Sequence, residues 1–244
     1  MRLDLATWPE VEAHLKTSGG IIIPTGSTEQ HGPMGLIGTD AICAAQIGEG
    51  AAEQAGTLAA PTLAYTPAPF NMTFPGTVSV SPALFEALVT EIVRGLSSQG
   101  FTHFYFLNGH GANLPPLRNV AASQASTKIC IRSWWEFEPV NVLRRDYYAD
   151  WEGMHGTPSE VAITQATHRI VEPGLAATPP RKLSMDYIRA HSGDRHGPPD
   201  EHRRDFPDGR VGSHSALATP GHGTALLAAA TATVAEDYLA YVAI

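Results

Sequence analysis

Short apolar runs alternate along this chain with longer stretches of helical periodicity, and that alternation limits the folds it can adopt. Each run is rich in β-branched or aromatic residues and ends at a loop signal, as buried strands do. The runs are Gly20 to Pro24 (GIIIP), Leu58 to Tyr65, Phe101 to Leu107 (FTHFYFL) and Lys128 to Ser133 (KICIRS). Strands that alternate with helices form a mostly parallel sheet between helical layers. The sequence therefore predicts a three-layer α/β/α fold with a mostly parallel central sheet, in one domain over residues 1–244.

Helices are predicted between and after these strands. The clearest follows Ser81-Pro82, has apolar residues at helical spacing and stops at Gly100. The others are predicted from an N-cap at Thr39 to about Gln54, after Pro115 and Pro116, from a cap at Ser159 to His168, and from Gly223 to Val242. Residues 192–222 lack periodicity and are rich in Gly, Pro, Asp, Arg and His, which predicts a long loop.

Composition narrows the class of partner. Only 16% of the residues are charged and the formal net charge is -8, so no basic surface for nucleic acid or anionic lipid is expected. No window approaches the length of an uncharged membrane span, and the first residues lack the apolar core of a signal peptide. Cys43 and Cys130 are far apart, without metal-site spacing, and are expected to be reduced and buried. These features predict a cytoplasmic enzyme with a small-molecule partner.

Candidate ligands follow two of the predicted strands. Glu29 and His31 come after the first strand and are two residues apart, so in an extended segment their side chains leave the same face. His110 follows the third strand between two glycines, and Asp40 lies at the start of a predicted helix. Open parallel sheets bind ligands outside the carboxyl ends of their strands. These four side chains are therefore predicted to converge on one site.

The mixture of imidazole and carboxylate in this group favours divalent cations. Such ligands suit Zn, Mn or Fe, and the absence of thiolate argues for an open catalytic site rather than a closed structural one. A pair of ions about 3.5–4 Å apart lowers the pKa of a shared water and polarises a carbonyl. Hydrolysis of an amide at neutral pH needs both effects.

Four sequence blocks carry a family resemblance. The run PTGSTEQHGPMGLIGTD resembles the signature of the creatininase (creatinine amidohydrolase) family, and FPGTVSV, FLNGHGAN and HGTPSEVA match its other blocks in the same order. Together they extend from about residue 20 to 165. The resemblance implies an α/β/α fold, a binuclear metal centre, hydrolysis of a carbon–nitrogen amide bond and a homohexamer.

The resemblance also implies roles for the metal ligands. Glu29 and His110 would bind one metal, His31 the other, and Asp40 would bridge them. Creatininase itself has a glutamate where this chain has Ala112, so the missing acid is expected to be replaced from the HGTPSEVA block. That assigns Glu160 to the site as a metal ligand and catalytic residue.

Substrate-facing residues follow from the same resemblance. His155 matches the catalytic histidine of the family, placed to protonate the leaving nitrogen or to orient the substrate. Trp151 precedes it at the spacing of a substrate-covering tryptophan. Asn71 lies ahead of the FPGT block, where relatives bring polar side chains toward the substrate, and the backbone of Gly109 is a possible donor nearby. Met34, Asn71 and Pro158 depart from the usual family residues, so creatinine is not implied as the substrate.

Each assignment has a structural alternative. Asp40 and Glu160 could be first-turn acids stabilised by helix dipoles, and His155 could hold a loop. Trp151 could be an amphipathic anchor and Asn71 a turn residue. Trp134 and Trp135 are expected mainly to pack. The histidines of the long loop favour a solvated loop or a subunit contact over a second metal site; they are His191, His196, His202, His214 and His222.

Three functions are compatible with these features to different degrees. The favoured one is hydrolysis of a small cyclic amide or formamide, with metal-bound hydroxide attacking the carbonyl and His155 protonating nitrogen. A precursor-peptide peptidase of the same family and a non-catalytic metal- or ligand-binding homologue are the alternatives. A nucleotide-binding Rossmann protein is disfavoured, because no GxGxxG or P-loop follows any strand.

Overall fold

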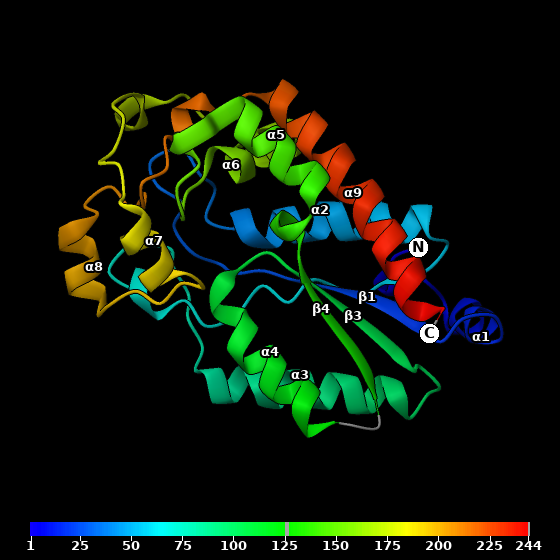
Figure 1. Ribbon diagram of the computed structural model, residues 1–244. Coiled ribbons are helices and arrows are strands. Elements are labelled where there is room, and N and C mark those ends of the chain that lie inside the picture. The colour runs from blue at the N-terminus through cyan, green and yellow to red at the C-terminus, as the bar shows by residue number, and fades with distance from the viewer. Residues whose placement is uncertain (125–126, 244) are drawn as a thin grey trace.

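The centre of the molecule is a four-stranded parallel sheet. The computed structural model describes residues 1–124 and 127–243. The strand order is β2-β1-β3-β4, with β1 aligned to β3 over its whole length and β3 to β4 likewise. The strands are β1 (Gly20–Thr25), β2 (Leu58–Ala59), β3 (His103–Asn108) and β4 (Lys128–Ser133). Helices cover both faces (Figure 1), which confirms the predicted fold class.

Both faces of the sheet are apolar, because β1 and β3 send side chains alternately into two cores. Ile22, Tyr105 and Leu107 face one core. Ile21 and Ile23 face the other, where they meet Phe104 and Phe106. This two-sided burial explains why the strands read as continuous hydrophobic runs.

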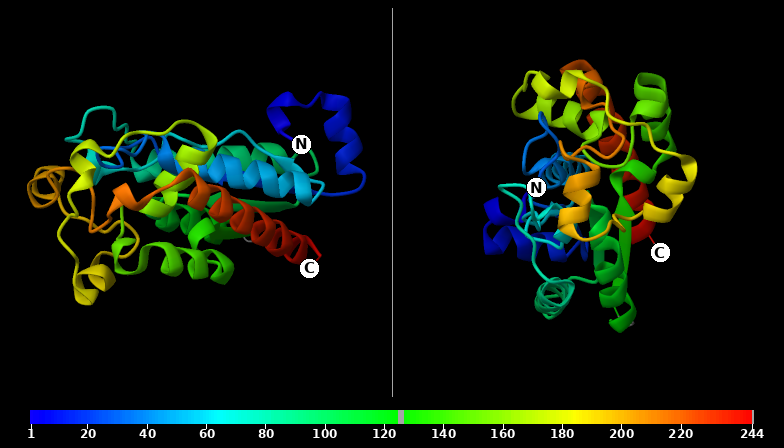
Figure 2. Two further views of the ribbon diagram at one scale, coloured as in Figure 1. Left: turned by 90° about the horizontal axis from the view of Figure 1, so that it is seen from above. Right: turned by 90° about the vertical axis from the view of Figure 1, so that its left-hand side faces the viewer.

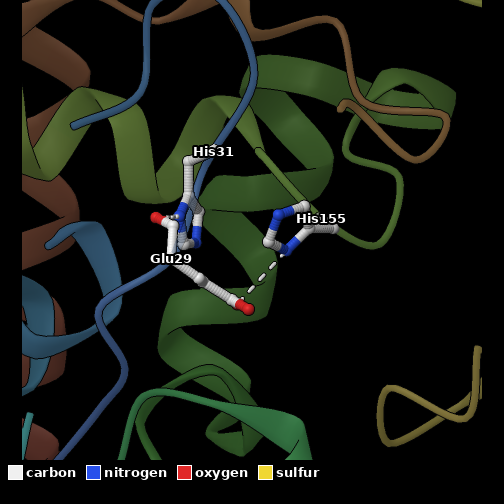
Figure 3. Close-up of side chains that lie close together, drawn as sticks. All are labelled: Glu29, His31 and His155. Carbon is white, nitrogen blue, oxygen red and sulfur yellow. Dashed lines mark hydrogen bonds and ion pairs between the residues drawn. The ribbon is translucent and has the colours of Figure 1, made fainter. Parts of the chain in front are cut away.

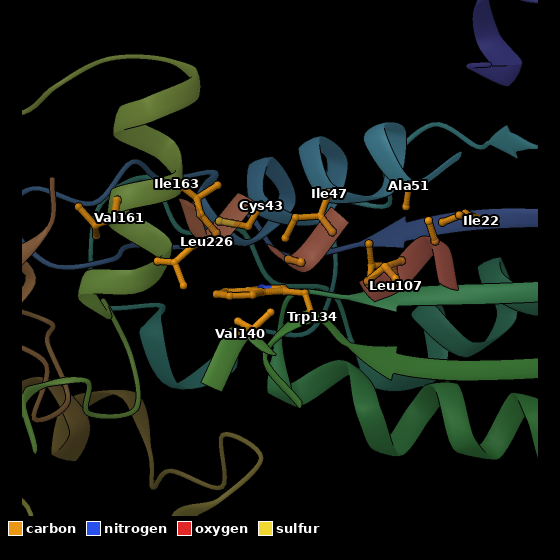
Figure 4. Close-up of a cluster of buried hydrophobic side chains, with 14 of the residues drawn as sticks. Ile22, Cys43, Ile47, Ala51, Leu107, Trp134, Val140, Val161, Ile163 and Leu226 are labelled. Atoms are coloured by element: carbon orange, nitrogen blue, oxygen red, sulfur yellow. The ribbon is translucent and has the colours of Figure 1, made fainter. Parts of the chain in front are cut away.

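The first layer contains α2 (Thr39–Gln54), α5 (Glu138–Tyr148), α6 (Pro158–Thr167) and α9 (Pro220–Val242). Its core gathers Cys43, Trp134, Val140 and Leu226, as Figure 4 shows. Helices α6 and α9 approach so closely that a Cβ at Gly223 would lie 1.9 Å from the carbonyl oxygen of Ala162. Only glycine allows this contact, and it fixes α6 beside the site described below.

The second layer contains α3 (Pro82–Ser97) and α4 (Leu114–Ser123), with α1 (Trp8–Leu15) at its edge. Helix α3 follows Ser81 as predicted, and the Ser81 hydroxyl caps it by accepting a 3.2 Å hydrogen bond from the backbone N–H of Leu84. None of the helices in the described ranges combines the length and the apolarity needed to cross a membrane.

Four helix starts differ from the prediction: α4 begins at Leu114, before Pro115 and Pro116, α9 begins at Pro220 rather than Gly223, and the caps of α2 and α6 are other residues. The N-cap of α2 is Gly38, and Thr39 instead donates its hydroxyl to the carbonyl of Leu36. The N-cap of α6 is Thr157, whose hydroxyl accepts from the N–H of Glu160, so Ser159 lies inside the helix. The predicted cap, Ser159, is two residues too late, because Pro158 occupies the first helical position, where proline is well suited.

The predicted strand Leu58 to Tyr65 is much shorter than expected. Only Leu58 and Ala59 pair as a strand, and Pro61 then interrupts the ladder because it has no N–H to donate. After β2 the chain stays beside β1 through single hydrogen bonds from the N–H groups of Ala60 and Leu63 to carbonyls of β1.

The predicted long loop is partly helical. Helix α8 (Pro199–Asp205) lies within it and α7 (Met185–His191) precedes it. Each has seven residues, too few to give a clear periodic signal. Both helices lie beyond the carboxyl ends of the strands (Figure 1), and Figure 2 shows them at the end of the molecule opposite α1. There His202 is buried and packs edge-on against Phe70, with 5.0 Å between the ring centroids, so this part of the loop is packed rather than solvated.

Candidate metal centre

The predicted ligands meet because β1 and β3 end level with each other. Thr25 pairs with Asn108, so the loops that follow leave the same edge of the sheet. The start of α2 presses against both loops. A Cβ at Gly26 would lie 2.3 Å from the backbone nitrogen of Ala41, and one at Gly109 would lie 2.5 Å from the carbonyl oxygen of Asp40. These two glycines therefore bring Asp40 between the loops.

One set of ligand atoms surrounds Nδ1 of His110. Glu29 Oε1 lies 3.1 Å and Asp40 Oδ2 3.0 Å from that nitrogen, and all three side chains are buried. His110 Nε2 lies 2.8 Å from the carbonyl oxygen of Pro67. Because a carbonyl can only accept, Nε2 carries the proton and Nδ1 is left as an electron-pair donor.

A second set surrounds Nε2 of His31. Asp40 Oδ1 lies 2.8 Å and Glu160 Oε1 3.8 Å from it. His31 Nδ1 donates to the carbonyl of Glu29 at 3.1 Å, which again leaves the other ring nitrogen facing the carboxylates. Asp40 thus offers one oxygen to each histidine. This arrangement could hold two cations with Asp40 between them.

Glu29 supplies a direct test of whether these residues fit a metal ion. Its Oε1 is buried and accepts no hydrogen bond from the described residues, although Nδ1 of His110 is within 3.1 Å. A buried carboxylate oxygen without a hydrogen-bond partner costs free energy unless a cation stabilises it. The imidazole and carboxylate donors around it are those that Zn and Mn accept. The residues therefore fit divalent metal ions.

The electrostatics of the site show how it holds protons when no metal is bound. Burial disfavours the charged form of His31, but Asp40 and Glu160 outweigh this and raise its pKa to about 10. Burial acts likewise on His110, yet Glu29 and Asp40 raise its pKa well above the usual value. The site is strongly attractive to cations, and metal ions would displace these protons.

Glu160 belongs both to the site and to the start of α6. The N–H of Thr157 donates to its Oε1 at 2.5 Å, which completes a capping box. Burial raises the pKa of Glu160 to about 8. The capping box at the start of α6 therefore also directs the Glu160 carboxylate toward His31.

His155 lies directly beside the two sets of ligands. Its ring centroid is 4.4 Å from that of His31, and its Nδ1 is 3.7 Å from Glu29 Oε1, as Figure 3 shows. Its Nε2 donates to the carbonyl of Gln30 at 2.7 Å. Burial and the nearby charge of His31 lower its pKa to about 4. At neutral pH this histidine is uncharged, with Nδ1 able to accept a proton.

Asn71 contacts the carboxylate of Glu29, and Gln30 in turn contacts Asn71. Asn71 donates to Glu29 Oε2 at 3.0 Å, and Gln30 donates to the side-chain oxygen of Asn71 at 2.7 Å. Both amides are buried. The observed contact of Asn71 is thus with a ligand residue, and its contact with substrate stays a prediction.

A family model described as creatinine amidohydrolase matches residues 4–238. The chain belongs to the creatininase family. This confirms the family that the four sequence blocks predicted.

Curated relatives of this family member align over part of the chain. A mycofactocin precursor peptide peptidase from Mycolicibacterium smegmatis is 38% identical over 108 residues, which are 42% of this chain and 43% of that protein. A 3-dehydro-scyllo-inosose hydrolase from Thermotoga maritima is 34% identical over 106 residues, 43% of this chain and 34% of that protein. The chain thus aligns with less than half the length of these relatives.

Solved structures of the creatininase family share the whole fold. A crystal structure of creatinine amidohydrolase superposes with a TM-score of 0.78 at 22% identity, over 97% of this chain and 95% of that one. A putative creatinine amidohydrolase from Bacteroides fragilis gives 0.76 at 21% identity, over 99% and 96%.

A cavity of about 340 Å³ opens onto the candidate metal centre. Asp40, His110, His155 and Glu160 form its inner end. Sequence reasoning missed several other lining residues, which include Leu114, Trp134, Trp135, Arg144, Ile188 and Asp194. The two tryptophans had a usable signal, since they directly follow β4 at the same edge of the sheet. Asp194 had none, because its loop shows no pattern that places it.

Neither Trp151 nor Gly109 is among the residues that line the cavity. The ring of Trp151 lies under Lys182 Nζ at 4.5 Å and beside His214, rather than among the residues that line the cavity. The N–H of Gly109 donates to the carbonyl of Thr25 at 2.7 Å, so a bond to substrate would have to replace that one. Their roles toward substrate stay predictions.

Proposed function

We propose that this protein is a binuclear metal-dependent amidohydrolase that cleaves the carbon–nitrogen bond of a small cyclic amide or formamide. The observation that carries the proposal is the position of Asp40, whose Oδ1 lies 2.8 Å from His31 Nε2 and whose Oδ2 lies 3.0 Å from His110 Nδ1. One carboxylate between two imidazoles, each with its other nitrogen bound to a carbonyl, suits a bridging ligand.

Two of the three groups of possible ligands in the described residues share Asp40, and the third is Glu29, His31 and His155. Glu29 and His110 would hold one ion, and His31 and Glu160 the other. Creatininase structures described as Mn and as Zn-Zn type support these metals here. When bound, such ions would lower the pKa of a water molecule and polarise the carbonyl group of the substrate.

His155 would move the proton in this reaction. Its Nε2–H donates to the carbonyl of Gln30 at 2.7 Å, and its Nδ1 lies 3.7 Å from Glu29 Oε1. A pKa lowered to about 4 keeps Nδ1 free of a proton at neutral pH. His155 can therefore take a proton from the attacking water and pass it to the leaving nitrogen.

The cavity supports a small, uncharged substrate. Its volume of about 340 Å³ is at the lower end for small-molecule sites. Trp134 and Trp135 offer apolar walls, and the charge of Arg144 is already paired with Glu152 at 2.9 Å. The relative that hydrolyses 3-dehydro-scyllo-inosose, by its name a small cyclic compound, agrees with this choice.

Precursor-peptide cleavage is the second candidate. The 38% identity with a mycofactocin precursor peptide peptidase favours it, although that match covers 42% of this chain. A peptidase would have to bring a peptide end into the same cavity. The two candidates therefore differ in the length of substrate that the enzyme accepts.

A substrate screen with matched variants tests the proposal. Protein stripped of metal and reloaded with Zn or Mn is offered cyclic amides, formamides and short peptides. We expect turnover of a small amide only after reloading, and its abolition in His31→Ala and Asp40→Ala but not in Asp186→Ala, which changes an exposed carboxylate. Cleavage of peptides alone would establish the second candidate. Binding of metal without turnover of any of these substrates would leave a non-catalytic homologue and contradict both.

A further inference from the structure

Asp194 reaches the metal centre from a part of the chain that no sequence block covers. It lies between α7 and α8, and its Oδ2 is 3.6 Å from Nδ1 of His110. Its side chain is only 12% exposed and lines the cavity. Glu29 Oε1, Asp40 Oδ2 and Asp194 Oδ2 thus approach one ring nitrogen from different elements.

The backbone holds Asp194 in an unfavourable conformation. Its φ is 55°, in the left-handed region that residues other than glycine rarely adopt. Gly193 before it also has a positive φ, of 76°. A strained residue of this kind persists only where its surroundings fix it, and such residues cluster at functional sites.

Two residues of the loop after β3, Gly111 and Ala112, lie against the Asp194 carboxylate. The N–H of Ala112 donates to Asp194 Oδ2 at 3.1 Å. A Cβ at Gly111 would lie 2.3 Å from the same oxygen, so glycine there leaves the space that Asp194 fills. Each carboxylate oxygen has two lone pairs, and the bond from Ala112 leaves one available for a cation.

The bond from Ala112 places the Asp194 carboxylate against the loop after β3, on the His110 side of Asp40. Glu160 does not fill this place, since it lies on the other side of Asp40, against His31.

We propose that Asp194 is a further ligand of the ion held by Glu29 and His110, supplied across the site by the loop between α7 and α8. This rests on the binuclear centre proposed above. The unpartnered Oε1 of Glu29 faces the same nitrogen and marks the place of that cation. With Asp194 the centre has four carboxylates, whose charge two divalent cations would cancel while both histidines stay neutral.

The test is a calorimetric titration of metal-free protein with Mn²⁺, repeated with Co²⁺ while the absorption spectrum is recorded. The proteins compared are the unaltered chain, the isosteric Asp194→Asn, Asp194→Ala, and Asp186→Asn as a control on an exposed carboxylate of neighbouring α7. We expect two binding events in the unaltered chain and in the control. In both Asp194 variants one event should weaken by about 10–100-fold, the scale of loss on removing a supporting group at a metal site. The Co²⁺ spectrum at saturation should also change, since the number of ligands falls.

The outcomes separate this inference from the proposed function. Two events with unchanged affinity in Asp194→Asn and Asp194→Ala would overturn the role of Asp194 and leave the binuclear centre standing. Weaker binding with an unchanged spectrum at saturation would likewise overturn it, because Asp194 would then act from outside the coordination sphere. Fewer than two events in the unaltered chain would overturn the centre itself.

Discussion

At the scale of single residues, the site works by fixing which nitrogen of each histidine faces the carboxylates. His31 gives its Nδ1–H to the carbonyl of Glu29, and His110 gives its Nε2–H to that of Pro67. Both bonds come from loops that follow the parallel strands. The spacing of Glu29 and His31 predicted that these side chains would converge, but the choice of ring nitrogen depends on carbonyls that sequence patterns do not place.

Metal binding should stabilise the protein more as the pH rises. Without metal, His31 has a pKa raised to about 10 from an ordinary value of 6.5, so the stability it contributes is full below pH 6.5 and is lost toward pH 10. The metal-bound histidine carries no such proton, so titration of His31 does not lower the stability of the metal-bound protein over this pH range. We therefore expect the increase in melting temperature on adding Mn²⁺ to grow from pH 6.5 to 9.5. A constant or shrinking increase in calorimetric scans would contradict the protonation of His31.

His155 should matter for turnover and not for metal content. In His155→Gln we expect kcat to fall by about 10²–10⁴-fold, the usual contribution of a positioned acid or base. Two ions should still bind, because the ligand sets around His31 and His110 remain. His168→Gln, at an exposed position after α6, is the control and should keep full activity. Loss of metal from His155→Gln would show that this ring is a ligand instead.

At the scale of elements, the predictions succeeded where one physical signal dominated. Lys128 to Ser133 was predicted to the residue, since Ile129 and Ile131 alternate with other residues and face one core in a short run bounded by loop signals. Leu58 to Tyr65 failed because Pro61 lacks a donor for the ladder. The start of α6 was misplaced by two residues, although Thr157 to Glu160 (TPSE) has the capping-box spacing that a sequence can show.

Helix capping and metal binding should be coupled at α6. Removing the hydroxyl in Thr157→Ala should lower the free energy of unfolding by about 1 kcal/mol, as for other N-caps. It should also weaken binding of one ion, because Glu160 loses part of the capping box that aims it. Ser81→Ala removes the cap of α3, none of whose residues lines the cavity, and should cost a similar stability with metal affinity unchanged. Denaturant titration and calorimetry measure the two quantities; equal metal affinity in both variants would contradict the coupling.

At the scale of the whole molecule, the site combines residues that sequence order keeps apart. The parallel sheet brings the loops after β1 and β3 together, and this part was predicted because strand direction follows from the alternation of strands and helices. The segment that contains Asp194, which lines the cavity, and the buried His202 could not be predicted. It is built by short helices and irregular turns whose positions depend on packing against Phe70 rather than on periodicity.

The family resemblance also leads us to propose a homohexamer. Light scattering coupled to gel filtration should give six times the chain mass of 26.0 kDa. A single species at the mass of one chain over a range of concentrations would contradict the hexamer.

The central claim is that Asp40 bridges two metal ions, and anomalous diffraction from crystals of the reloaded protein tests it most directly. Data at the Zn or Mn absorption edge should show two peaks about 3.5–4 Å apart, the spacing usual for such pairs. One peak should lie by Glu29 and His110, and the other by His31 and Glu160, with Asp40 between them. A single peak, or two peaks without Asp40 between them, would contradict the account.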